Sequence, residues 1–206
     1  MTSSSSLRPS PLALTVLAML NHEPLHPYGI QRLLKQWGKD QVVNVGQRAG
    51  LYRIIERLLA AGLIEVRETG RDQQYPERTV YQATDAGRHA AHSWLEEMLA
   101  EPKQEFPQFP AALSNLLMLM PDEAQQVLQQ RADALEATLR ELRSSLDEEA
   151  ASGLPRVTML ESEYLVAVTA AELAWLQSVI EDLQAQRLSW STSSLQAAAA
   201  AAAAAS

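Results

Sequence analysis

The stretch from Gly50 to Gly87 constrains the fold of this chain more than any other part of the sequence. Between Gly50 and Ala61 the apolar residues recur at spacings of three and four, which predicts one buried helix face, and Gly62 favours the end of that helix. The runs Leu63–Glu68 and Val80–Ala83 alternate and are rich in β-branched or aromatic residues, so they predict two strands. A short helix followed by a hairpin is typical of a winged helix-turn-helix.

The segments on either side of this stretch predict further helices. Helices are expected over Pro11–Leu20, with Ser10 as the cap, and over Tyr28–Trp37, which would end at Gly38. Val42–Gly46 is expected to form an extended connector. After the hairpin, Thr84 or Asp85 would cap another helix that continues through Trp94 to about Leu99.

The second half of the chain predicts two long helices. A short helix over Ala111–Met120 precedes one from Pro121 to about Glu149 and a last one from about Arg156 to Arg187. Apolar residues of the first long helix step by four and three, which forms a heptad seam that needs a partner helix. The last helix has two apolar faces, more than one neighbour would cover, so a second subunit is expected. The seam consists of Leu128, Ala132, Leu135, Leu139, Leu142 and Leu146. One apolar face of the last helix consists of Met159, Val166, Leu173, Leu176, Ile180 and Leu183. The other consists of Leu160, Tyr164, Val168 and Trp175.

These segments favour a mainly α protein with a small two-stranded wing, in which a winged helix-turn-helix is joined to a C-terminal helical dimerisation domain. We expect a disordered N-terminus (1–9), a DNA-binding domain (10–100), a linker with a short helix (101–120), antiparallel long helices for dimerisation (121–190) and a tail (191–206). The tail contains nine consecutive alanines, Ala197–Ala205, which we interpret as a non-native or placeholder segment and exclude from functional argument.

Charge is divided unevenly between the two halves. The chain has a net charge of −8, but residues 7–100 carry 11 Lys/Arg against 10 Asp/Glu, whereas residues 101–206 carry 6 against 15. DNA affinity depends on the local charge near the phosphates rather than on the net charge of the chain, so this division favours a separate function for each half. The chain has no cysteine, which excludes disulfides and thiolate metal sites. Without a long apolar run or a signal segment, a soluble cytoplasmic protein is expected.

The candidate DNA-binding residues are cationic or phenolic. Arg53 and Arg57 lie one turn apart on the polar face of the Gly50–Ala61 helix, where they can enter a major groove. Arg48 precedes that helix, and Tyr28 and Tyr52 lie near helix starts, where each can contact a phosphate. Arg71 and Arg78 belong to the hairpin and can approach the minor groove. The alternatives are a solvated helix face for Arg53 and Arg57, core packing for Tyr28 and Tyr52, and hairpin solubility for Arg71 and Arg78.

Several motifs in order resemble the PadR family of bacterial transcriptional regulators. They are Leu25–Ile30 (LHPYGI), Gly50–Tyr52 (GLY), Leu58–Ile64 (LLAAGLI), Pro76–Tyr81 (PERTVY) and Thr84–Gly87 (TDAG), and later Gly153–Arg156 (GLPR) and Ala171–Leu176 (AELAWL), which resemble its long-tailed branch. The resemblance covers about Leu12 to Arg187. It implies a homodimeric repressor whose first helix and C-terminal helices form the dimer, and many members release DNA on binding a small, often aromatic, compound. The family usually has Ser or Thr at the position of Gly50, so a direct phosphate contact is not expected there.

Two tryptophans are candidates for effector binding. A flat apolar effector would stack on Trp94 or Trp175, and the alternative is plain packing in the dimer core. His89, His92 and Glu96 are the one set with near-metal spacing, and no metal or other cofactor is expected. No catalytic motif is present in the sequence, so we expect a transcriptional regulator that binds double-stranded DNA rather than an enzyme. The alternative is a winged-helix protein-interaction module without DNA binding, which would lack a steep salt dependence of binding to duplex DNA.

Overall fold

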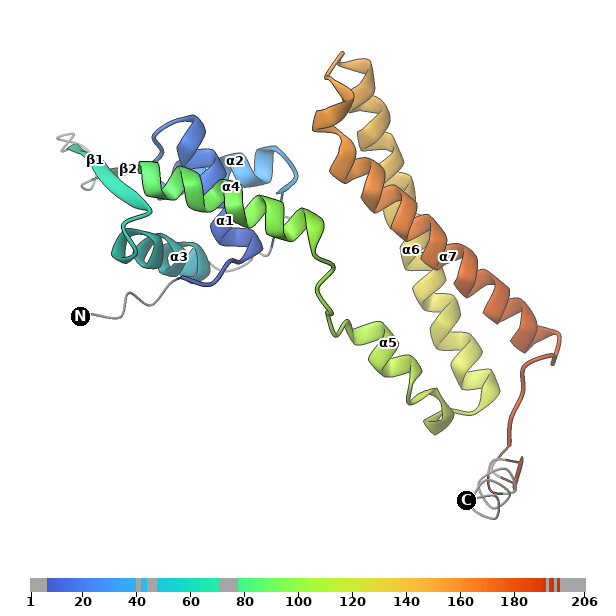
Figure 1. Ribbon diagram of the computed structural model, residues 1–206. Helices are drawn as coiled ribbons and strands as arrows, with labels where there is room; N and C mark the ends of the chain where they lie inside the picture. Colours follow the sequence, from blue (N-terminus) through green and yellow to red (C-terminus); the bar gives the residue numbers. More distant parts are fainter. Residues whose placement is uncertain are drawn as a thin grey trace. The chain divides into compact units, whose positions relative to one another are not determined.

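The computed structural model describes residues 7–39, 42–43, 48–70, 78–191, 193–194 and 196, and the chain divides into an N-terminal unit (1–105) and a C-terminal unit (106–206). Figure 1 shows the helices and strands of both units. The N-terminal serines up to residue 6 and the alanines Ala197–Ala205 lie outside the described residues. None of the helices in the described ranges is long and apolar enough to cross a membrane.

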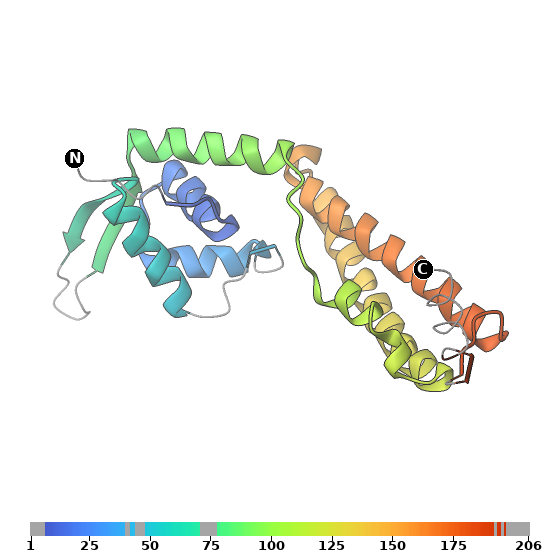
Figure 2. The same ribbon diagram turned by 60° about the horizontal axis from the view of Figure 1, so that its bottom comes forward.

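The described residues of the N-terminal unit form four α-helices and two strands: α1 (Pro11–His22), α2 (Pro27–Gln36), α3 (Arg48–Ala60), β1 (Ile64–Gly70), β2 (Arg78–Ala83) and α4 (Asp85–Ala100). Helix α1 contacts both α4 and α3 and lies between them (Figure 2). Ser10 caps α1, as the sequence predicts, by accepting a hydrogen bond from the Ala13 amide at 3.2 Å. Because other helices cover α1 on two sides, apolar residues are favoured nearly all round it.

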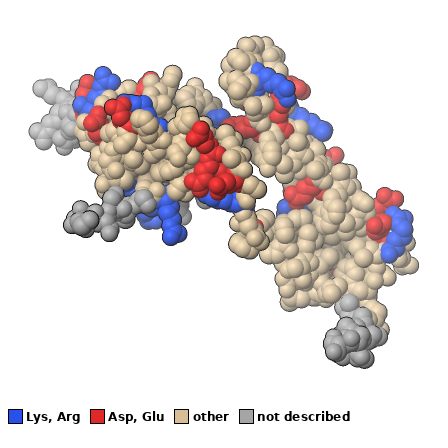
Figure 3. Space-filling model, viewed as in Figure 1, with Lys and Arg blue, Asp and Glu red and all other residues tan. Residues whose placement is uncertain are grey.

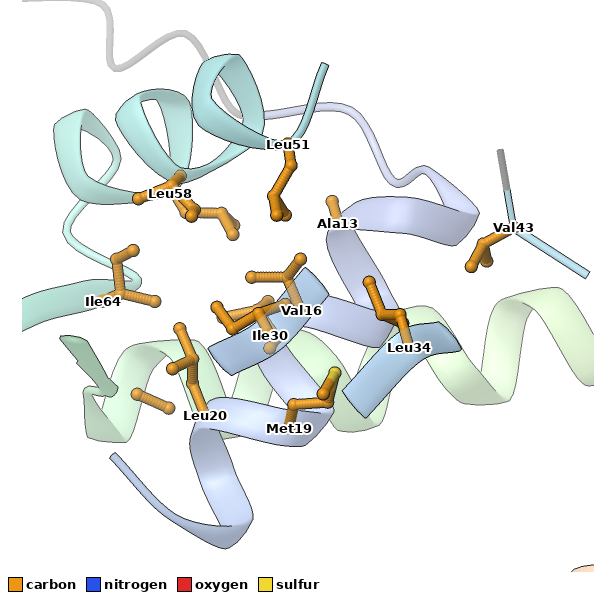
Figure 4. Close-up of a cluster of buried hydrophobic side chains, with 13 residues drawn as sticks. Ala13, Val16, Met19, Leu20, Ile30, Leu34, Val43, Leu51, Leu58 and Ile64 are labelled. Carbon is orange, nitrogen blue, oxygen red and sulfur yellow. The ribbon is translucent and has the colours of Figure 1, made fainter. Parts of the chain in front are cut away.

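One hydrophobic cluster holds this unit together. Leu17 and Val16 of α1 are fully buried, and they pack with Ile30 and Leu34 of α2 and Leu58 of α3 (Figure 4). Because these side chains come from three helices, the cluster fixes α2 and α3 against α1 and leaves their opposite faces to solvent. The helix-turn-helix is thus positioned by apolar packing rather than by polar contacts.

The wing is an antiparallel pair of strands. β1 pairs with β2 from Ile64↔Ala83 to Gly70↔Arg78, and a bulge falls at Arg67, between Val66 and Glu68. A bridge from Leu25 to Tyr81, with two hydrogen bonds of 2.9 Å, ties the segment before α2 to the outer edge of β2. Both strands are longer than the sequence predicts, because pairing toward the hairpin extends them to Gly70 and from Arg78.

The C-terminal unit is built on two long antiparallel helices, α6 (Pro121–Ala151) and α7 (Leu160–Gln184), seen side by side in both ribbon views. The predicted heptad seam is confirmed: Leu128, Ala132 and Leu139 are buried in one cluster with residues of α7. The partner of the seam is therefore α7 of the same chain. Helix α5 (Gln108–Leu113) packs on this cluster through Phe109 and Leu113. Trp190, beyond α7, donates a hydrogen bond to the Leu119 carbonyl at 2.9 Å.

Several predicted element bounds are wrong. Helix α3 begins at Arg48 and not at Gly50, so Gly50 is its third residue and Tyr52 lies past its first turn. The preceding Arg and Ala are better helix formers than glycine, which explains the earlier start. Val42 and Val43 form a turn, not an extended connector, since both amides bond to the Lys39 carbonyl and Val43 is buried.

The other corrections concern the C-terminal unit. The expected helix Ala111–Met120 is instead α5 followed by a 3₁₀ helix, Leu116–Met118. Ser114 and Asn115 turn their side chains onto the Ala111 carbonyl, at 2.8 and 2.9 Å, and side-chain bonds of this kind compete with a continuous helix. The last helix likewise opens with a 3₁₀ helix, Arg156–Thr158, before α7.

Candidate nucleic-acid interface

The outer face of α3 is polar and cationic. Leu51, Ile55 and Leu58 turn inward and are almost completely buried, which leaves Arg53 and Arg57 exposed. The two arginines lie four residues apart, so their side chains occupy one stripe of the helix. Tyr52 adjoins them with 48% of its surface exposed. The predicted polar face is therefore present, and the core-packing alternative for Tyr52 is not supported.

Helix α2 carries a second stripe of the same character. Tyr28, Arg32 and Lys35 follow at spacings of four and three, opposite the buried Ile30 and Leu34. Tyr28 is 63% exposed, and both cations are exposed as well. Arg32 and Lys35 were not among the candidates from the sequence, although their spacing relative to Tyr28 is the signal that identifies them.

The charges on these two helices are largely unpaired. Helices α2 and α3 hold five Lys/Arg residues and one acid, Glu56. Within the described part of the chain, Arg32, Lys35, Arg53 and Arg57 form no ion pair. A solvated polar face usually interleaves opposite charges, as the C-terminal unit does in its Arg131–Glu172, Arg156–Glu163 and Arg187–Asp182 pairs. The α2–α3 face is instead suited to a polyanion.

Acidic side chains are gathered elsewhere on the same unit. In Figure 3 they cluster over the C-terminal part of α4, which carries Glu96 and Glu97 and is followed by Glu101. This distribution explains how an almost neutral unit can still present a cationic face. Local charge, not the total, decides what the α2–α3 face attracts.

Three predicted DNA-binding residues have no described side chain. Arg48 is the first residue of α3 and Arg78 the first of β2, but only their backbones are described. Arg71 lies outside the described residues. Their contacts stay predictions from the sequence.

The two candidate effector tryptophans occupy different surroundings. Trp94 of α4 is half-buried against the hydrophobic cluster of its own unit, so it packs within one chain, and neither effector stacking nor packing in a dimer core is tested. Trp175 of α7 is 45% exposed, and its ring meets Phe109 edge to face at 6.2 Å. Among the described residues no group of three potential ligands is arranged to hold a metal ion. His89 Nδ1 instead lies 2.7 Å from the Asp85 carbonyl, and His92 pairs with Glu96.

Comparisons with known proteins agree with this geometry. Residues 16–93 match the transcriptional regulator PadR-like family. The chain resembles the crystal structure of Bacillus subtilis PadR in complex with operator DNA, at 21% identity and a TM-score of 0.71, over 84% of this chain and 99% of the other. The same protein in complex with p-coumaric acid gives 18% and 0.68, over 84% and 98%.

A third structure extends the likeness to another organism. The Vibrio cholerae virulence activator AphA is 20% identical with a TM-score of 0.61, over 85% of this chain and 99% of the other. No curated protein sequence matches the chain. The structural matches cover both units, so the shared fold includes the long helices as well as the wing. Residues 16–93 of this chain therefore form a domain of the PadR-like family of transcriptional regulators.

Proposed function

We propose that this protein is a transcriptional regulator that binds double-stranded DNA through α2 and α3. The observation that carries the proposal is the exposed, unpaired cationic face of these two helices on a PadR-like domain. Exposed cations without acidic partners are free to displace counterions from phosphates, which is the main source of DNA affinity.

Each stripe has a distinct role in this proposal. Arg53 and Arg57 on α3 enter the major groove, where a guanidinium donates two hydrogen bonds to the edge of a guanine. Tyr28, Arg32 and Lys35 on α2 lie along the phosphate backbone, because the first helix of such a motif crosses the backbone rather than entering the groove. The first stripe would confer specificity and the second would set register and affinity.

The regulator is proposed to act as a homodimer through its long helices. Leu160, Tyr164 and Val168 form an exposed apolar stripe on α7, away from the face that packs on α6 and outside the residues that pack against Phe109. Exposed apolar stripes of this length mark interaction surfaces. A two-fold dimer would place two α3 helices in successive major grooves of a pseudo-palindromic operator, roughly 34–36 Å apart. The first helix is proposed to contribute, as the family resemblance implies.

We further propose that the protein represses transcription and is released by a small, aromatic effector. The solved relatives support this mode, since B. subtilis PadR is known in complex with operator DNA and with p-coumaric acid. The V. cholerae relative is described as a virulence activator, so the shared fold alone does not determine the direction of regulation. An effector acts only if it binds the free and DNA-bound forms with different affinity.

Binding to duplex DNA measured across a salt series tests the proposal. Affinity should fall steeply with salt, and Lys35→Ala should reduce the slope of log K against log [salt] by about 1, because its ammonium neutralises one phosphate. Arg53→Ala is expected to cost about 1–3 kcal/mol on the cognate site and to relax specificity.

Arg140→Ala is the matched control. Arg140 of α6 is also exposed and forms no ion pair within the described residues, so its removal changes total charge equally. It should leave DNA affinity nearly unchanged. Equal losses of affinity from Arg53→Ala and Arg140→Ala would show that the loss comes from the change in total charge and not from a contact made by Arg53. Salt-independent or absent DNA binding would favour the winged-helix protein-interaction module instead.

A further inference from the structure

The C-terminal unit contains an apolar pocket that the DNA-binding role does not use. It has a volume of about 370 Å³ and lies among α5, α6 and α7. Small-molecule sites typically occupy roughly 300–1,000 Å³, and a cavity of about 150 Å³ already admits benzene. The pocket therefore has room for a compound of one or two fused rings.

The walls of the pocket are apolar and aromatic. Phe109, Pro110 and Leu113 of α5 line one side, and Trp175 of α7 lines the other. The two aromatic rings meet at 75° with centroids 6.2 Å apart, and Trp175 keeps nearly half of its surface open. An exposed indole in such a position offers a face on which a planar ring can stack.

One ion pair at the edge of the pocket determines which ligand charge is favoured. Arg131 lies with its guanidinium carbon 3.7 Å from the centroid of the Phe109 ring, and both its Nε and Nη2 reach Glu172 Oε1, at 2.7 and 2.6 Å. The two charges neutralise each other and the stacked ring holds the guanidinium in place. A charged ligand would lose its own hydration and gain only by competing with an existing partner. A neutral hydroxyl or N–H group can bond to either member and leave the pair intact.

We propose that this pocket binds a planar, uncharged aromatic compound of one or two rings, stacked on Trp175 with a hydrogen-bonding substituent toward Arg131 and Glu172. The inference rests on the proposed function in that such a compound would be the effector of the regulator. It places the effector site in the C-terminal unit alone and assigns no role to Trp94.

Calorimetric titration of the full chain with 2-naphthol tests the proposal. Saturable binding is expected, and Trp175→Ala should weaken it about tenfold or more, because the stacking surface is removed. Trp175→Phe should restore much of the affinity. Val127→Ala is the control: Val127 of α6 is exposed to the same degree as Trp175 but does not line the pocket, so binding should change by less than about twofold. The anionic 2-naphthoate and the cationic 2-naphthylmethylammonium should each bind about tenfold more weakly than 2-naphthol.

Each contrary outcome overturns a stated part of the proposal. Absence of saturable binding, or equal losses of affinity from Trp175→Ala and Val127→Ala, would refute the site. Equal affinity for a charged analogue would refute the neutral ligand class. Salt-dependent DNA binding measured on the same preparations separates the two proposals. If the protein binds DNA but not 2-naphthol, only the pocket proposal is refuted. If it binds 2-naphthol but not DNA, only the proposed DNA-binding function is refuted.

Discussion

Gly87 is predicted to be the least replaceable of the glycines whose surroundings the structure describes in the N-terminal unit. It is the third residue of α4, and a Cβ added to it would lie 1.9 Å from the carbonyl oxygen of Leu63 and 2.9 Å from its carbonyl carbon. Leu63 is held at both ends of its peptide unit, because its amide bonds to Leu58 and its carbonyl accepts the Thr84 amide at 3.1 Å. The clash is with backbone that cannot rotate away, so α4 or the start of the wing must move.

The magnitude follows from two opposing contributions. Forcing extra atoms into a packed site costs about 1–3 kcal/mol, and backbone contact at this distance belongs at the upper end. Replacing a helical glycine by alanine returns up to about 1 kcal/mol. Gly87→Ala should therefore lower the free energy of unfolding by about 2 kcal/mol. Gly50 is also the third residue of a helix, α3, and nothing lies within 4 Å of its added Cβ. Gly50→Ala should instead be neutral or stabilise by about 0.5–1 kcal/mol.

Urea unfolding followed by circular dichroism measures both variants under one condition. The midpoint should fall in Gly87→Ala and should stay the same or rise in Gly50→Ala, with unchanged slopes. A wild-type midpoint for Gly87→Ala would refute the inferred close approach of α4 to the wing. A loss of stability in Gly50→Ala equal to that in Gly87→Ala would show that the effect comes from helix starts in general and not from the Leu63 contact.

Three further predictions concern the cap of α4, the exposed stripe of α7 and one ion pair. Thr84→Ala should lower the free energy of unfolding by about 1 kcal/mol, measured by urea titration, because its hydroxyl accepts a hydrogen bond from the third amide of α4 at 3.0 Å; Thr84→Ser should behave as wild type. Tyr164→Glu should shift sedimentation equilibrium toward monomer, whereas Tyr164→Phe should not; an unchanged mass would remove α7 from the interface. The hydrogen bond from Arg156 lowers the pKa of Glu163 below its ordinary value, so the stabilisation is present above about pH 4.3 and is lost as the pH falls through the lowered pKa; in Arg156→Ala, NMR titration should find that pKa back in its ordinary range.

Local periodicity was sufficient to predict the longer helices, apart from their exact bounds, and the seam. The steps of four and three through Leu128, Leu135 and Leu139 specify one face of a helix, and α7 supplies the matching face in the same chain. Gly62 likewise ends α3 with a φ of 69°, a conformation that glycine adopts without strain. Such features depend on neighbours in sequence, which is why they can be predicted without a structure.

Contacts between distant residues could not be predicted in this way. The bridge joins Leu25, which precedes α2 in the sequence, to Tyr81, which follows α3. Nothing in the sequence around either residue specifies this pairing. The break between α5 and the following 3₁₀ helix depends on where Ser114 and Asn115 direct their side chains. In the candidate interface, Arg53 and Arg57 were predicted from their spacing. That they have no acidic partner in the described chain could not be predicted, because ion pairing depends on which residues the fold brings together.

The division of charge also bears on how such a protein would find DNA. A net charge of −8 repels phosphate at long range, but that repulsion is screened over about 10 Å at 0.1 M salt. The contacts from α2 and α3 weaken with salt too, so added salt relieves the repulsion while it weakens the attraction. The salt dependence should therefore be shallower than the five cations of these helices alone would give. Non-specific binding would suffer most, since it has little besides charge. Discrimination between the operator and other DNA would then depend mainly on where Arg53 and Arg57 meet base edges, and a change in the spacing of two α3 helices would weaken binding to the operator.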